Sequence, residues 1–243
     1  MFVDGRAATK PATQVQTDQA ITVRDNEGPQ WVSRGAHKLL GALAAFEPEG
    51  LSVAGRRCLD AGASTGGFTE VLLSRGASEV LAVDVGYGQL AWSLRSDERV
   101  QVFDRTNVRE LTSATLGGPV DVAVSDLSFI SLTVVLPALS EVCAQGGDMV
   151  LMVKPQFEVG RSKVGKNGVV RDPDLHVGAV QQVCDAAFTL GWGTRAVAAS
   201  PLPGPAGNVE YFAWLRTDAG RAEATAIETA VATGPLAAAG GNA

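Results

Sequence analysis

From residue 57 onward, short apolar segments rich in β-branched residues alternate with segments whose apolar residues recur at helical spacing. The near-continuous apolar run at residues 120–124 is typical of a strand buried on both faces of a parallel sheet. This alternation predicts an α/β, Rossmann-like fold with a doubly wound, mostly parallel sheet. Seven strands are expected, at residues 57–61, 79–85, 100–103, 120–125, 148–153, 194–199 and 209–215.

Helices are expected between these strands, at residues 67–75, 89–95, 131–143 and 172–190, the last opened by Asp172 as cap and Pro173 in the first turn. An earlier helix, with Ser33 as N-cap, would bury Leu39, Leu43 and Phe46 at helical spacing. Only residues 200–208, rich in proline and glycine, separate the last two strands, so the last strand is expected to run antiparallel. That arrangement is found in methyltransferases, whereas the dehydrogenase variant of the fold is all-parallel.

The chain divides into four parts by composition. Residues 1–27 hold two short alternating segments, at 1–3 and 20–23, around a stretch of turns, and predict a small β-rich piece. A linker at residues 28–32 precedes the main domain at residues 33–217. Residues 218–243 are rich in alanine, glycine and threonine and predict a frayed helix followed by a disordered tail.

Composition argues against several functional classes. The longest uncharged apolar stretch, residues 127–140, contains a proline and is too short to cross a bilayer, while Asp4, Arg6 and Lys10 interrupt any signal peptide. A cytoplasmic protein without a membrane partner is therefore expected. The three cysteines lie far apart in apolar segments and only two histidines are present, so reduced core cysteines are expected and a metal site is not.

The first strand ends in a turn of small residues that runs from Asp60 through Gly62, Gly66 and Gly67 to Phe68. Glycines at such a turn let a cofactor approach the backbone closely. A dinucleotide site would show GxGxxG around a pyrophosphate, whereas this turn reads D-x-G-x-x-x-G-G. A carboxylate at Asp60 would repel a pyrophosphate and attract the cationic sulfonium and amino group of S-adenosylmethionine (SAM). SAM is thus the expected cofactor, and a tight turn without a ligand is the alternative.

Asp84 ends the second strand, at a position where a carboxylate can hold a ribose diol. Proteins that bind nicotinamide cofactors share this feature, so Asp84 alone does not separate the two classes. A turn or helix cap is the structural alternative for this residue.

Four more residues are expected at the same edge of the sheet. Asp126 and Lys154 end neighbouring strands, and a lysine that ends an apolar strand is costly to bury unless it is paired or functional. A desolvated lysine can act as a general base toward a ribose hydroxyl, and a structural ion pair with Asp126 is the alternative. Glu210 is expected to open the last strand at this edge. Lys38 lies one residue off the apolar stripe of the first helix, where it can reach the same site or be a surface lysine.

The formal net charge of −6 is unusual for a nucleic-acid enzyme, whose contact surface is normally basic. Any contact with RNA therefore has to be local. Residues 155–168 form a glycine-punctuated loop that is too long for an ordinary connection. Phosphate contacts are expected from Arg34 and from the basic residues in and beside this loop, namely Arg161, Lys163, Lys166 and Arg171. A flexible loop without a partner is the alternative.

These stretches closely resemble the TlyA (haemolysin A-like) rRNA 2′-O-methyltransferases, relatives of the FtsJ class. The resemblance covers residues 31–39, 58–73, 82–94, 125–132, 153–160 and 200–214 and so extends through the main domain. It implies a catalytic Lys-Asp-Lys-Glu tetrad at Lys38, Asp126, Lys154 and Glu210. It also implies a SAM pocket formed by Gly62, Ala63, Ser64, Gly67, Phe68, Asp84 and the Asp126 strand end, with Asn107 near adenine.

The resemblance further implies methylation of cytidines in 16S and 23S rRNA, with ribosomal RNA or ribosomal subunits as the partner. Family members begin with an S4 RNA-binding domain whose basic helices precede strands such as those expected in residues 5–23. Those helices are absent from this sequence, so residues 1–27 are expected to be a remnant of an S4 domain.

Two alternatives stay open. One is a membrane-active protein, as the haemolysin name of relatives suggests, although no strongly amphipathic basic segment supports it. The other is a SAM-dependent methyltransferase that acts on a protein or a small molecule, which would not need Lys154 as a base.

Overall fold

The computed structural model describes residues 2–4, 6–8, 14–22 and 31–235, and its contacts divide the chain between Trp31 and Val32. In the first unit, the strands β1 (Phe2–Val3), β2 (Arg6–Ala7) and β3 (Ile21–Thr22) form a small antiparallel sheet in the order β2-β1-β3. The strand β2 falls within the stretch that was expected to form turns only. Most of the predicted linker, residues 28–30, lies outside the described residues.

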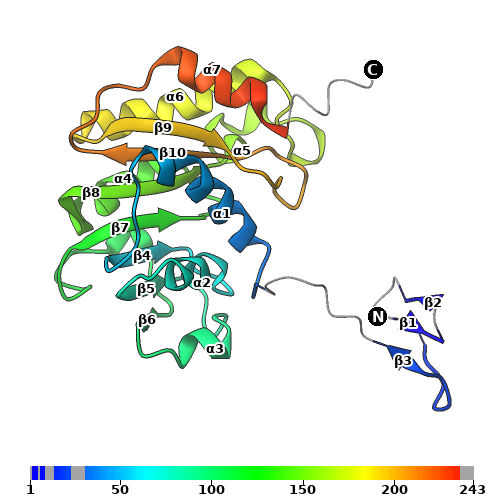
Figure 1. Ribbon diagram of the computed structural model, residues 1–243. Coiled ribbons are helices and arrows are strands. Elements are labelled where there is room, and N and C mark those ends of the chain that lie inside the picture. The colour runs from blue at the N-terminus through cyan, green and yellow to red at the C-terminus, as the bar shows by residue number, and fades with distance from the viewer. Residues whose placement is uncertain (1, 5, 9–13, 23–30, 236–243) are drawn as a thin grey trace. The chain divides into compact units, whose positions relative to one another are not determined.

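The second unit contains one seven-stranded sheet in the order β6-β5-β4-β7-β8-β10-β9 (Figure 1). Its strands are β4 (Arg57–Ala61), β5 (Glu79–Val83), β6 (Val100–Phe103), β7 (Val120–Ser125), β8 (Cys143–Val153), β9 (Gly193–Ala199) and β10 (Tyr211–Arg216). The strands from β6 to β8 pair in parallel, and β10 runs antiparallel to both of its neighbours, β8 and β9. The predicted fold class, including the antiparallel last strand, is confirmed.

Helices cover both faces of the sheet. On one face lie α1 (Gly35–Phe46), drawn in front of the strands in Figure 1, and α2 (Gly67–Ser74), where Phe46 and Phe68 pack on Trp214 and Phe212 of β10. The other face carries α4 (Leu132–Val142), α6 (Pro173–Thr189) and α7 (Ala224–Thr233). These helices share a buried cluster with the residues of β10 that point away from α1 and α2. Two apolar faces explain why the strands read as nearly continuous apolar runs.

The first helix begins differently from the prediction. Leu39, Leu43 and Phe46 are buried as expected, but α1 starts at Gly35 and no side chain caps it. Instead, the Ser33 hydroxyl oxygen lies only 2.2 Å from the position that a Cβ on Gly67 would take, so Ser33 packs against the turn after β4. Contact between two small residues, rather than a capping hydrogen bond, places the start of α1 beside the end of β4.

Several other boundaries differ from the prediction. The strand β8 begins at Cys143, before the predicted residue 148, because a register shift opposite Val120 and Val122 accommodates Gly146 at φ +78°. The helix α3 (Trp92–Arg95) is shorter than predicted. In the predicted tail, α7 buries Ile227, Ala230 and Val231 beside β9 and α6, so this helix is packed rather than frayed. Residues 236–243 lie outside the described part of the chain.

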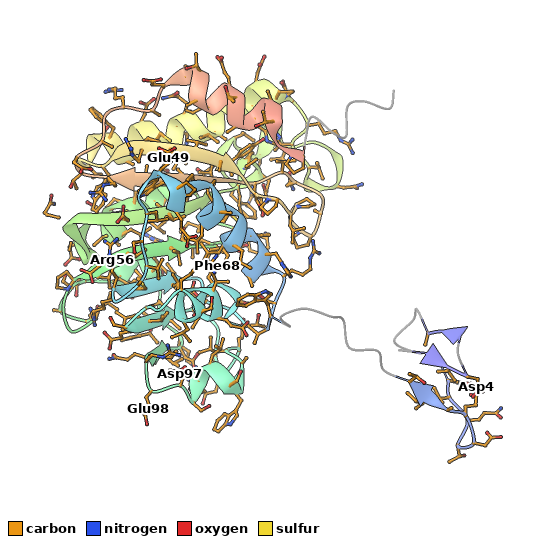
Figure 2. All side chains as sticks on the ribbon, viewed as in Figure 1. Asp4, Glu49, Arg56, Phe68, Asp97 and Glu98 are labelled. Carbon is orange, nitrogen blue, oxygen red and sulfur yellow. The ribbon has the colours of Figure 1, made fainter. Side chains whose placement is uncertain are left out.

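A buried carboxylate joins β8, β10 and the residue before β4, at the end of the sheet opposite the one where β4 and β7 terminate. Asp148 on β8 accepts hydrogen bonds from Trp214 Nε1 at 2.7 Å, from Arg56 at 2.5 Å and from Arg216 at 3.1 Å. In Figure 2, Arg56 lies at the left end of the strands and Phe68 lies nearer the right end. Asp148 therefore has a structural role away from the edge where the candidate site residues end their strands.

Cys58, Cys143 and Cys184 are free and buried, as predicted. Among the described residues, no helix is long and apolar enough to span a membrane.

Candidate active site

The turn after β4 forms one wall of the candidate site. Gly62 adopts φ +91°, and an ideal Cβ there would lie 2.9 Å from the carbonyl oxygen of Asp126. A side chain at this position would collide with the backbone that follows β7. The N–H groups of Gly62 and Ala63 both donate to the carbonyl oxygen of Val83, which ties the turn to the end of β5.

Asp84 follows β5 and organises two backbone segments. Its Oδ2 accepts the N–H of Ser64 at 2.9 Å, and its Oδ1 accepts the N–H of Gly86 at 2.7 Å. Asp84 and Asn107 line a cavity of about 500 Å³ whose apolar walls are Val85, Val108, Leu127, Ile130 and Val135. The Asn107 side-chain oxygen accepts the N–H of Arg109, which leaves its NH₂ group to contact a ligand. A carboxylate, an amide and apolar walls together suit a nucleoside.

A second cavity, of about 420 Å³, adjoins the first along Gly62, Ser64, Asp126 and Ser128, which line both. Its remaining walls come from the start of α1, the turn before α2, Lys154 and the prolines of the segment before β10. They are Ser33, Arg34, Gly35, Lys38, Ala63, Thr65, Gly67, Phe68, Lys154, Pro203 and Pro205. The two cavities therefore form a continuous site at the ends of β4, β5, β7 and β8.

Two ion pairs lie at the second cavity. Lys154 Nζ is 2.5 Å from Asp126 Oδ1 and donates to Ser128 Oγ at 2.9 Å. Lys38 Nζ is 2.5 Å from Glu210 Oε2 and 3.9 Å from the sulfur of Met152. The structure thus brings together the four residues that the sequence analysis placed in one tetrad.

Burial makes these pairs informative. The Lys38 and Glu210 side chains are only 9% and 1% exposed, so Lys38 is not a surface lysine. Buried ion pairs seldom stabilise a fold more than apolar side chains of the same size would, because both ions lose their hydration. This buried pair and the partly buried Lys154–Asp126 pair beside one cavity therefore indicate chemistry rather than stability. Glu210 does not line the cavity itself but lies behind Lys38, one residue before β10 begins.

Two predicted cofactor contacts are placed elsewhere. Asp60 lies within β4, is fully buried and accepts the hydroxyl of Thr69 at 2.7 Å, so its carboxyl group does not line either cavity. Burial raises the pKa of Asp60 to about 7, which weakens the expected attraction to a cation. At Gly66, φ is +101° and the position of a Cβ is occupied by Leu90 and Leu94, so this glycine faces α3 rather than the cavities.

The basic residues lie on exposed segments. Arg34 is exposed at the rim of the second cavity, and Arg161, Lys163 and Arg171 are exposed along the segment between β8 and α6. The side chain of Lys166 lies outside the described residues. This segment is not loop throughout, because it contains α5 (Pro155–Glu158) and the 3₁₀ turns Arg161–Lys163 and Lys166–Gly168.

Sequence reasoning gave no role to two residues of the site, Ser128 and Phe129, or to Glu158 beside it. Ser128 binds Lys154, and Phe129 is 91% exposed at φ +64° while lining the first cavity. Glu158 accepts hydrogen bonds from Ser131 Oγ and from the N–H of Leu132, which caps α4 and ties α5 to the segment after Asp126. The sequence signal for Ser128 and Phe129 was their place directly after Asp126. The role of Glu158 had no local signal, because its partners lie on another helix.

A profile of the family described as FtsJ-like methyltransferase matches residues 31–217. The chain belongs to this family. It is 58% identical, over 96% of its length and 88% of the relative, to "16S/23S rRNA (cytidine-2′-O)-methyltransferase TlyA" of Mycobacterium tuberculosis strain H37Rv. The sequence-based prediction of an FtsJ-related methyltransferase similar to TlyA is confirmed.

Solved structures agree with this assignment. A Lactococcus lactis protein that carries the hemolysin name superimposes with a TM-score of 0.78 at 44% identity, over 83% of this chain and 96% of that one. An S-adenosylmethionine-dependent methyltransferase from Mesorhizobium loti superimposes with a TM-score of 0.53 at 15% identity, over 72% of this chain and 97% of that one, which shows the fold alone. Within the described residues of this FtsJ-like methyltransferase, no group of histidine, cysteine, aspartate and glutamate side chains is arranged to hold a metal ion.

Proposed function

We propose that the protein transfers a methyl group from SAM to the 2′-hydroxyl of a cytidine ribose in ribosomal RNA. The observation that carries this proposal is the presence of the buried Lys38–Glu210 pair and the partly buried Lys154–Asp126 pair beside a cavity continuous with the one at Asp84. The high identity to a relative named for cytidine-2′-O-methylation of 16S and 23S rRNA supports the same substrate.

The residues present fit SAM. Each carboxylate oxygen of Asp84 spends one lone pair on a backbone N–H and keeps another for a ribose hydroxyl. The apolar side chains around Asn107 suit the adenine ring, and the turn after β4 lines the second cavity with Gly62, Ala63, Ser64 and Gly67, where the rest of the molecule can lie against the backbone. When bound, SAM supplies a methyl group activated by the sulfonium charge.

Lys154 is assigned the role of general base. Its amine lies at the second cavity, where Asp126 and Ser128 occupy two of its hydrogen-bonding directions and leave a third toward the cavity. An unprotonated amine in this position can accept the proton of the 2′-hydroxyl as that oxygen attacks the methyl carbon. Asp126 fixes the direction of the amine and stabilises the ammonium formed by the transfer.

Lys38 and Glu210 are assigned a positioning role. The Glu210 carboxylate holds the Lys38 ammonium against Met152 of β8, so that the charge faces the cavity from the α1 side. An ammonium fixed there can hold a ribose or phosphate oxygen of the substrate in line with the methyl donor. Such positioning replaces a bimolecular encounter by a bound one and can supply a large part of the rate.

RNA contacts are assigned to the exposed basic residues. Arg34 stands at the cavity rim, and Arg161, Lys163 and Arg171 extend the positive charge along the segment between β8 and α6. Phosphate contacts of this kind fix the register of an RNA without reading its sequence. The exposed ring of Phe129, which lies against Phe157, offers a face on which the target base can stack. Residues 1–27, as an S4-like element, complete the proposed domain organisation.

The test is transfer of radiolabelled methyl groups from SAM to ribosomal subunits and to free rRNA, followed by nuclease mapping. Label in a nuclease-resistant dinucleotide that contains a 2′-O-methylcytidine supports the proposal. Label on a base would overturn it, and so would label on protein in place of RNA. A matched substrate in which the target ribose lacks its 2′-hydroxyl should accept no methyl group.

A further inference from the structure

The basic segment between β8 and α6 ends in a residue whose backbone is held from both sides. Val170, which precedes Arg171, donates its N–H to Asn208 Oδ1 at 3.0 Å, and its carbonyl oxygen accepts from His176 Nε2 at 3.0 Å. The Asn208 amide also donates to the carbonyl oxygen of Gly168 at 2.9 Å. Two buried side chains thus hold the end of the segment.

Asn208 and His176, the two side chains that bind Val170, are both connected to residues close to Glu210. Asn208 is two residues before Glu210 in the chain. His176 Nδ1 lies 3.0 Å from the hydroxyl of Tyr211, the residue after Glu210, and the two rings meet edge to face. The side chains of Asn208, His176 and Tyr211 are almost completely buried. The basic segment is therefore attached on both sides of Glu210.

The hydrogen-bond directions at His176 are fully determined. A carbonyl oxygen only accepts, so Nε2 must carry the proton that bonds Val170. Burial lowers the pKa of His176 and favours the neutral ring. In the neutral ring Nδ1 is then an acceptor, and the Tyr211 hydroxyl must be its donor. Each polar group in this chain of contacts has one role, which makes the arrangement rigid.

The segment before β10, which contains Asn208, also packs against the Glu210 carboxylate. The carbonyl oxygen of Asn208 accepts the N–H of Gly204 at 2.8 Å, which closes a turn between Gly204 and Asn208. An ideal Cβ on Gly204 would lie 2.7 Å from Glu210 Oε1, so this turn touches the carboxylate that holds Lys38. A shift of Asn208 would therefore move both the turn and the basic segment.

We propose that Asn208 and His176 are positioning residues that couple the basic segment to the Lys38–Glu210 pair, so that an RNA phosphate bound at Arg171 is held in register with the reacting ribose. This inference rests on the proposed function, because it takes RNA as the partner of Arg171. A purely structural role would need only that the backbone groups of Gly168 and Val170 find some partner. Here the partners are Asn208, which lies two residues before Glu210, and His176, which contacts Tyr211, the residue after Glu210.

The test compares wild type, Asn208→Ala and Tyr211→Phe in methyl transfer to ribosomal subunits, with SAM affinity measured separately. Asn208→Ala should lower kcat/KM for RNA by about tenfold or more, as expected for the loss of the two hydrogen bonds that its amide makes to Val170 and Gly168, and leave the Kd of SAM unchanged. Tyr211→Phe removes only the hydroxyl and should have a smaller effect in the same direction. Ser140→Ala is the matched control, because it removes a part-buried side-chain hydrogen bond, the one from Trp192 Nε1, away from the site.

A double-mutant cycle with Arg171→Ala separates coupling from simple destabilisation. If Asn208 acts by placing Arg171, the two substitutions together should lower kcat/KM by little more than the larger single effect. Fully multiplicative effects would overturn the proposal. It would also be overturned if Asn208→Ala lowered the Tm as Ser140→Ala does while kcat/KM for RNA stayed at the wild-type value.

Failure of the proposed function gives a different result. In that case wild type itself transfers no methyl group to RNA. The attachment of the segment is then tested by trypsin cleavage after Arg161, Lys163 and Arg171, which should be faster in Asn208→Ala than in Ser140→Ala. Equal cleavage rates in these two variants would show that Asn208 does not hold the segment.

Discussion

Replacement of Lys154 tests the proposed chemistry most directly. In Lys154→Ala the amine that lies between Asp126 and Ser128 is lost, while the cavity at Asp84, which Lys154 does not line, keeps its walls. General-base assistance typically contributes roughly 10²- to 10⁴-fold in rate. We therefore expect kcat to fall by about that factor, equivalent to about 3–5 kcal/mol of transition-state stabilisation.

Binding and folding should change little in the same variant. The Asp126 side chain is 22% exposed, so water can partly solvate its carboxylate once the lysine is gone. The free energy of unfolding should then fall by about 1–2 kcal/mol, less than the loss expected for a fully buried pair. The Kd of SAM, measured by calorimetry, should stay within roughly twofold of wild type, a difference below about 0.5 kcal/mol.

Lys154→Arg distinguishes a base from a fixed positive charge. A guanidinium keeps the pairing with Asp126 but does not release its proton near neutral pH, so single-turnover methyl transfer should stay close to that of Lys154→Ala. Lys163→Ala is the matched control: this lysine is exposed on the basic segment, so its loss should raise KM for RNA and leave kcat nearly unchanged. Wild-type rates in Lys154→Arg would refute the role of Lys154 as a base.

Three carboxylates give further predictions. Asp84→Ala should weaken SAM binding by about 1.5–3 kcal/mol in calorimetry, because a charge-assisted contact to the ribose is lost; unchanged affinity would contradict its assignment. Asp148→Ala should lower the free energy of unfolding by about 3 kcal/mol, since Arg56 and Arg216 lose a buried partner, while SAM affinity, measured alongside denaturant unfolding, stays constant. For Asp60, burial raises the pKa from 3.8 to about 7, so the native state keeps a proton that the unfolded chain releases. The stability of wild type relative to Asp60→Asn should therefore fall as the pH rises from about 4 to about 7 and level off above; a constant difference across this window would count against the buried carboxyl.

Much of the candidate site was visible in the sequence because it depends on where strands end. Asp84, Asp126 and Lys154 each follow a strand of the parallel part of the sheet, and the carboxyl ends of such strands meet at one edge whatever the loops do. The glycines of the turn after β4 were equally visible, since positive φ angles leave few other residues possible. Residue type and strand position were sufficient for this part of the prediction.

The sequence did not show which partners the buried polar side chains would find. Lys38 and Glu210 are 172 positions apart, and the short-range pattern around Lys38 fitted a surface lysine equally well. Asp60 illustrates the opposite error: its place near a strand end suggested a ligand contact, but its side chain points toward Thr69 of α2. Nothing in the local sequence shows which of two faces a strand residue takes when both faces are buried.

The sequence by itself determined the order of strands and helices, the antiparallel last strand, the glycine turn and the residue types at the active edge. These follow from local sterics and from the periodicity of burial, which act over a few residues. Only the tertiary structure decided that Lys38 pairs with Glu210, that Glu158 caps α4, and that Asn208 and His176 hold Val170. Each of these contacts joins segments distant in the chain, and a buried polar group finds its partner only when packing has brought such segments together.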